Sequence, residues 1–68
     1  MVMLTKEQIR ELRDALELSV YDFAKKLGVS IDAVYRWERG QRHPSWRQMQ
    51  KLNKMWAEAE RRGLLQVA

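Results

Sequence analysis

The sequence predicts an all-α domain, and three observations support this fold class. Apolar residues recur every three or four positions along most of the chain, which is the period of a helix face. The chain has only three glycines and one proline among 68 residues. Gly28, Gly40 and Gly63 each follow a periodic stretch, where glycine can adopt the left-handed conformation that ends a helix. The predicted helices cover about residues 6–16, 20–27, 31–39 and 46–62.

Hydroxyl side chains mark the expected helix starts. Thr5, Ser19 and Ser45 each precede a periodic stretch and are followed three residues later by a polar residue, as in an N-terminal capping box. The three polar partners are Gln8, Asp22 and Gln48, of which the aspartate is short for the return hydrogen bond. Ser30 stands directly before the third stretch, so we expect it to cap that helix.

Each predicted helix carries one apolar stripe that we expect to face the core. The stripes are Ile9, Leu12 and Leu16; Phe23, Ala24 and Leu27; Ile31, Val34 and Trp37; and Trp46, Met49, Leu52, Trp56 and Ala59. Together they form one core, which predicts a single domain over residues 1–68. A chain of this size buries only roughly 60% of its unfolded surface, so folding alone is marginal and self-association is an open alternative.

The residue types exclude several classes of protein. The chain has no cysteine and one histidine, His43, so it lacks a disulfide framework and a ligand set for structural zinc. An enzyme is not expected either, because there is no second histidine, no glycine-rich phosphate loop and no convergence of acids. We therefore predict no catalytic residue, no metal and no cofactor. The N-terminus lacks signal-peptide features and charges interrupt the apolar stretches, which predicts a cytoplasmic protein without a membrane partner.

Positive charge is concentrated in the second half of the chain. The formal net charge is +4. Residues 1–35 contain five Lys and Arg against six Asp and Glu, a net −1, whereas residues 36–68 contain eight against three, a net +5. An acidic partner is indicated, although composition alone leaves DNA, RNA and a membrane surface open.

Only three residues separate the second and third predicted helices. Gly28, Val29 and Ser30 are too few for a relaxed antiparallel hairpin, so the two helices must turn sharply, as in a helix-turn-helix. Val29 is expected to plug the core between them. Ala24 lies one turn before Gly28, where a small side chain lets the helices approach closely.

Residues 18–40 carry a pattern that extends beyond this turn. It comprises Phe23-Ala24, Gly28-Val29-Ser30, Val34, Trp37-Glu38 and Gly40, with Pro44-Ser45 after it. On these residues the chain resembles the lambda-repressor/Cro type of helix-turn-helix DNA-binding domain, found in Xre-like transcriptional regulators, over roughly residues 6–56. The resemblance implies a compact lambda-repressor-like domain of four to five helices. Its helix-turn-helix would cover about residues 20–39, followed by a long helix at about 46–62 and a tail at 63–68.

The resemblance also implies that residues 31–39 enter the major groove. Candidates to face base edges are Ile31, Asp32, Ala33, Tyr35 and Arg36. Arg36 can fork onto guanine O6 and N7, Asp32 can accept from a cytosine amino group, and Ile31 or Ala33 can touch a thymine methyl. Asp32 has a structural alternative, since an acid in the first turn complements the helix dipole. Arg36 could likewise be an ordinary solvated charge.

Further residues are implied as phosphate contacts, which fix register without reading sequence. They are the backbone of Val20, Tyr21, Arg39, Gln41, Arg42, His43, Ser45 and Arg47. Many family members have glutamine where this chain has Val20, so a side-chain contact is absent there. The backbone N–H groups at that helix end could still bind phosphate. His43 is equally readable as a solvent-facing loop residue, and the charged loop as simply solvated.

Two more features concern stability. The resemblance implies that Glu38 pairs with Arg13 of the first helix and clamps it to the third. Glu17 stands where the family often has glycine, so a positive φ there would strain the chain by roughly 1 kcal/mol.

Trp37 could stack on a base, but its spacing with Val34 favours the core.

The C-terminal region is unusually apolar for so small a chain. An exposed apolar patch commonly marks an interface, which predicts a homodimer built from Trp56, Ala59, Leu64, Leu65 and Val67. The alternative is that the tail folds back onto the chain's own core or frays.

These features lead to two expected functions. The first is a sequence-specific, double-stranded DNA-binding transcriptional regulator, a repressor that occupies an operator through residues 31–39. The alternative is an antitoxin-like protein-interaction module that binds a partner such as a toxin and binds DNA only secondarily.

Overall fold

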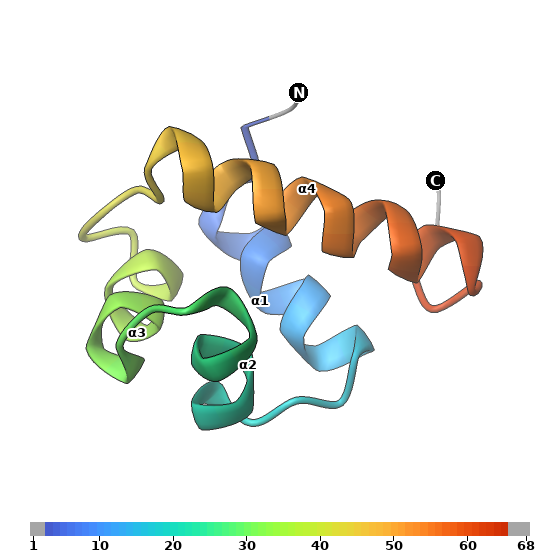
Figure 1. Ribbon diagram of the computed structural model, residues 1–68, viewed down its shortest axis with the longest axis horizontal. Helices are drawn as coiled ribbons and strands as arrows, with labels where there is room; N and C mark the ends of the chain where they lie inside the picture. The colour runs from blue at the N-terminus through green and yellow to red at the C-terminus, as the bar shows by residue number, and fades with distance from the viewer. Residues whose placement is uncertain (1–2, 66–68) are drawn as a thin grey trace.

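A computed structural model describes residues 3–65, which form four helices and no strand (Figure 1). The helices are α1 (Lys6–Ala15), α2 (Val20–Leu27), α3 (Ile31–Glu38) and α4 (Trp46–Arg61). The predicted all-α fold class is therefore confirmed. Three of the helices end one residue earlier than predicted, which is the usual ambiguity at a helix end.

Each helix begins at the predicted hydroxyl side chain. The N-caps are Thr5, Ser19, Ser30 and Ser45. The N–H of Thr5 donates to Gln8 Oε1 at 2.9 Å and the N–H of Gln8 donates to Thr5 Oγ1 at 3.1 Å. Ser45 and Gln48 form the same reciprocal pair, at 2.8 and 3.3 Å. These caps satisfy N–H groups that have no acceptor within the helix.

All four helices end with the same backbone arrangement. A residue of positive φ follows each of them: Glu17 (56°), Gly28 (71°), Gly40 (74°) and Gly63 (71°). The N–H of this residue donates to the carbonyl of the residue three positions before it. The N–H of the following residue donates to the carbonyl of the residue five positions before itself. After α1, for example, Glu17 donates to Asp14 at 3.0 Å and Leu18 donates to Arg13 at 3.2 Å. The three glycines thus stand where predicted, and Glu17 adopts the same conformation without being glycine.

One buried cluster joins the four helices. Its members are Leu4, Ile9, Leu12, Phe23, Ala24, Leu27, Val34, Trp37, Met49, Leu52, Ala59 and Leu65. Most residues of the predicted stripes are among them, including Trp37, which is only 3% exposed. Leu16 and Trp56 are half-buried at the edge of this cluster.

The stripe pattern was wrong for two residues at helix N-termini, one of which, Ile31, was also predicted to face base edges and therefore to be exposed. Trp46 is 69% exposed and Ile31 is 39% exposed, although the stripe pattern placed both in the core. Each is the first residue of its helix. Helical side chains point back toward the N-terminus, so these two side chains project past the end of the helix instead of onto a neighbouring element.

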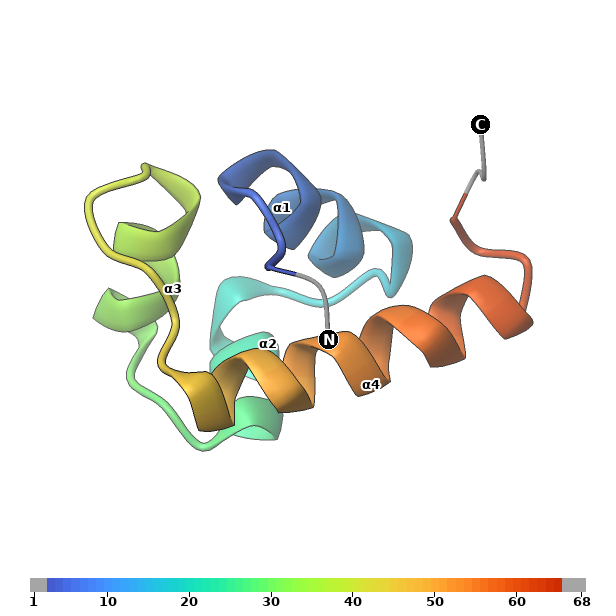
Figure 2. The same ribbon diagram turned by 90° about the horizontal axis from the view of Figure 1, so that it is seen from above.

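The tail also differs from the expectation. The chain turns off the helix axis after α4 (Figure 2), and Leu65 is 6% exposed within the core cluster. Ala59 is fully buried. Two residues predicted for a dimer surface are therefore used by the chain's own core, as in the alternative of a folded-back tail. Leu64 is 39% exposed, and Val67 lies outside the described residues.

The helices pack so that α3 and the C-terminal half of α4 lie at opposite ends of the molecule (Figure 1). α3 packs on α2 and α1, and α4 crosses α1 and α2. None of the helices described is long and apolar enough to cross a membrane. Within residues 3–65 no group of three metal-ligating side chains lies together.

Candidate nucleic-acid interface

The inner side of α3 is fixed in the core. Val34 and Trp37 are buried, and Val29 in the preceding turn packs half-buried against the same cluster. Ala24 is 2% exposed beneath the turn. The inner side chains thus set the position of α3, and its outer face is left to the solvent.

Four of the five candidate base-reading residues share that outer face. Ile31, Asp32, Tyr35 and Arg36 are all exposed, and at 100° per residue they form one continuous strip along the helix. Ala33 differs, because it is half-buried and packs against the core. The structure brings the first four together and places Ala33 at the edge of the strip.

Two of these residues contact each other. Arg36 Nε donates to Asp32 Oδ2 at 2.7 Å, with side chains 49% and 71% exposed. The acid precedes the base by four residues, which is the favourable order on a helix. An exposed pair of this kind contributes only about 0.3–0.5 kcal/mol to stability. It does, however, hold the guanidinium against the helix.

A second arginine rests on the same face. The guanidinium carbon of Arg39 lies 5.6 Å from the centre of the Tyr35 ring, a cation–π contact. Tyr35 is 45% exposed, so the ring serves as a support for the arginine at the surface. Arg36 and Arg39 are therefore both held by a partner one turn earlier on α3.

The loop after α3 is tied to the end of that helix. The N–H groups of Gln41 and Arg42 donate to the carbonyl of Arg36, at 2.9 and 3.3 Å. Pro44 is buried and anchors the loop on its inner side. The phosphate candidates from this region are all exposed: Arg39, Gln41, Arg42, His43, Ser45 and Arg47. The Ser45 hydroxyl oxygen already accepts from Gln48, which leaves its proton available to an anion.

The start of α2 supplies the other phosphate candidates. Tyr21 is 59% exposed and Val20 is half-buried. Ser19 accepts from the N–H of Asp22 at 3.1 Å, so the N–H groups of the first two helical residues lie at the positive end of the helix. The exposed carboxylate of Asp22 lies in the same turn and opposes an approaching phosphate.

An ion pair between α1 and α3 holds the exposed face in place. Arg13 donates from Nε to Glu38 Oε2 at 2.8 Å and from Nη2 to Oε1 at 3.1 Å, with side chains 16% and 10% exposed. Its third bond runs from Nη1 to the carbonyl of Leu18 at 3.2 Å. The hydrogen bond to Glu38 is the main cause that raises the pKa of Arg13, against the opposing effect of burial. The clamp implied by the resemblance is formed.

A family model described as helix-turn-helix matches residues 9–55. The chain belongs to the lambda-repressor/Cro-type helix-turn-helix family. In this family the domain binds DNA, and α3 is the second helix of the helix-turn-helix. Searches of curated proteins and of solved structures found no match to the chain.

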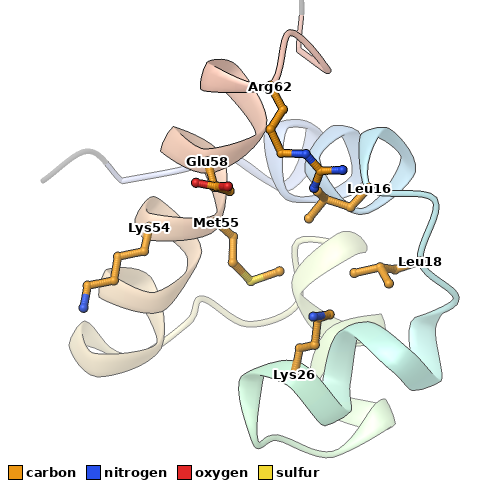
Figure 3. Close-up of a pocket in the computed structure, with 7 residues that line it drawn as sticks. All are labelled: Leu16, Leu18, Lys26, Lys54, Met55, Glu58 and Arg62. Carbon is orange, nitrogen blue, oxygen red and sulfur yellow. The ribbon is translucent and has the colours of Figure 1, made fainter.

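This helix-turn-helix domain also has a hollow away from α3. It lies between α1, α2 and α4, has a volume of about 420 Å³, and is floored by Leu16, Leu18 and Met55 (Figure 3). Around it stand Lys26, Lys54, Arg62 and Glu58. Glu58 is paired with the neighbouring Arg61, so the rim is cationic on balance.

Sequence reasoning missed two arrangements in this helix-turn-helix domain. The Asp32–Arg36 pair could have been anticipated from the spacing of four residues between an acid and a base. The hollow had no such signal, because its residues come from α2, from α4 with the residue after it, and from the link between α1 and α2.

Proposed function

We propose that the protein is a sequence-specific, double-stranded DNA-binding transcriptional regulator that acts in the cytoplasm as a repressor. The observation that carries this proposal is the exposed strip on α3, held by a buried inner side and the Arg13–Glu38 clamp. A helix fixed in this way can be inserted into a major groove about 12 Å wide. Bound over an operator, it would exclude the transcription machinery.

The residues of the strip suit different base edges. Arg36 presents donors for guanine O6 and N7, and Ile31 presents a methyl-rich surface for thymine. Tyr35 carries a hydroxyl that can donate or accept. Arg39, Arg42 and the loop between α3 and α4 would contact phosphates on either side, since they are exposed and the two arginines are positively charged.

We also propose that two copies bind together. The exposed Leu64 and the half-buried Trp56 would form the contact, without Ala59 or Leu65. Two recognition helices in a dimer would read half-sites about 34 Å apart. Sedimentation of the wild type and of Leu64→Asp tests this, and a monomeric wild type at high concentration contradicts it.

The salt dependence of duplex binding tests the function. Each phosphate neutralised by the protein should lower log K by roughly 0.9 for each log unit of added salt. We expect a steep slope of log K against log salt for the wild type. For Arg42→Ala we expect a slope shallower by roughly 0.9, the amount that one phosphate contact contributes. Glu60→Gln, on exposed α4 surface, is the matched control and should keep the slope. A flat response for the wild type would overturn the proposal.

The hollow favours a second candidate function. A floor of three apolar side chains with a cationic rim suits an acidic amphipathic segment of a partner protein, as expected of an antitoxin-like module. In that case Lys54→Glu should abolish capture of an acidic amphipathic peptide and leave DNA binding intact. A peptide that fails to bind the wild type removes this candidate.

A further inference from the structure

Asp32 is the acid on the exposed strip of α3, where a negative charge opposes DNA phosphates. Its side chain is 71% exposed and lies in the first turn of the helix. The N-cap of this helix is Ser30, so the carboxylate is not needed for capping. What the carboxylate does contact is the guanidinium of Arg36, at 2.7 Å.

The geometry of that contact leaves a particular edge of Arg36 free. A guanidinium has one N–H on Nε and two on each Nη. Asp32 accepts from Nε, so the outer edge with both Nη groups stays available. Two parallel donors are what a fork onto guanine O6 and N7 requires.

The partner also restricts where Arg36 can go. A free arginine on this surface has several rotamers and can reach the nearest phosphate, a contact that adds affinity without sequence information. Leaving Asp32 for a phosphate would strand the carboxylate close to the DNA backbone. The pair therefore favours the conformation aimed along the strip over one turned to the side.

We propose that Asp32 is a specificity-determining residue that acts through Arg36, holding its Nε so that the two Nη groups face a guanine. This inference rests on the proposed function. Asp32 is a positioning residue here and does not itself touch a base. One position in each bound half-site is accordingly a guanine, whose recognition requires both residues.

Parallel selection from a random duplex pool tests the proposal with the wild type, Asp32→Ala, Arg36→Ala and the double variant. The affinity of each protein is then measured for two duplexes, the site selected by the wild type and the same site with its guanine replaced. We expect the wild type to prefer guanine by on the order of 10-fold or more. Asp32→Ala should lose most of this preference while keeping its affinity for the replaced site, because Arg36 is released to phosphate.

The double variant separates positioning from direct reading. If Asp32 acts through Arg36, the double variant discriminates no worse than Arg36→Ala alone. If Asp32 itself reads a cytosine, the losses of sequence discrimination in Asp32→Ala and Arg36→Ala add in the double variant, and the proposal is overturned. Asp32→Asn keeps an acceptor for Nε and should fall between the wild type and Asp32→Ala.

One control variant excludes charge as the cause, and comparison across duplexes excludes stability. Glu60→Gln removes one carboxylate charge from α4 and should leave the guanine preference unchanged. A purely structural role for Asp32 would weaken binding to every duplex by the same factor, which would overturn the proposal. A wild type that selects a site which Asp32→Ala reads equally well overturns only this inference. A wild type that selects no sequence overturns the proposed function as well.

Discussion

Arg13 and Glu38 bring opposite charges into a contact that is more than four-fifths shielded from water. Removing one partner leaves the other charge without compensation, at a cost on the order of 3 kcal/mol. We expect Arg13→Ala and Glu38→Ala each to lower the free energy of unfolding by about that amount and to weaken DNA binding through loss of folded protein. Denaturant unfolding measures this directly.

Arg10 supplies the control for the clamp, because it is an exposed arginine on the same helix. Arg10→Ala should change the free energy of unfolding by less than about 0.5 kcal/mol. Unchanged melting temperatures for the two clamp variants would mean that the contact stabilises nothing.

Glu17 is the residue whose backbone is least suited to its side chain. It has φ 56° and makes the hydrogen bonds that glycine makes after the other three helices. Replacing it with glycine should remove roughly 1 kcal/mol of strain. For a domain of this size that raises the melting temperature by about 4–8 °C. A melting temperature below that of the wild type would refute the strain.

Gly28→Ala is the converse variant. Its Cβ would have space, since the nearest atom is Lys51 Nζ at 3.8 Å, but φ is 71°. We therefore expect destabilisation of similar size, caused by backbone conformation alone.

Residue patterns predicted the backbone better than the surface. Caps and positive φ are local properties, so Thr5, Ser30 and Gly40 could be assigned from their neighbours alone. Exposure depends on what lies beyond a helix end. Trp46 fits the stripe of α4 by its spacing, yet its side chain is exposed. Spacing along one helix does not show whether another element covers a residue.

At the scale of elements, α3 is short and depends on its ends. It has eight residues, and an isolated helix of that length is not stable in water. Ser30 accepts from the N–H of Ala33 at 3.1 Å at one end, and the loop N–H groups bond Arg36 at the other. The outer strip is kept helical by these caps and by the buried Val34 and Trp37.

The N-cap of α3 can be tested by itself. Ser30→Ala should lower the free energy of unfolding by about 1 kcal/mol, because the N–H of Ala33 loses its acceptor. Ser30→Asp retains an acceptor and should restore most of the stability. Equal stability of all three proteins in thermal unfolding would contradict the role of this cap.

The candidate interface was only partly predictable at this scale. The strip of Ile31, Asp32, Tyr35 and Arg36 follows from the helical period once the buried side is known. The partial burial of Ala33 could not be predicted, because the resemblance gives a stretch of helix and not its rotation about the axis. The rotation is fixed by packing against α1 and α2, which are distant in sequence.

Across the whole molecule, the segment that follows α4 contributes to the core through Leu65. Leu65 is buried in the same core cluster as Ala59, whereas its neighbour Leu64 is exposed. Leu65→Ala should cost about 2–3 kcal/mol of stability and Leu64→Ala less than about 0.5 kcal/mol. Unfolding of the two variants under the same conditions makes the comparison. Equal losses would show that the tail is not packed as described.

The central claim concerns the whole molecule: the outer strip of α3 and the loop after it form the DNA surface. The most direct test is an NMR titration of the isotope-labelled chain with duplex DNA, following every backbone amide. We predict that the shifts concentrate at residues 31–36 and 39–47. Shifts confined to the hollow between α1, α2 and α4, with the amides of α3 unchanged, would contradict the claim.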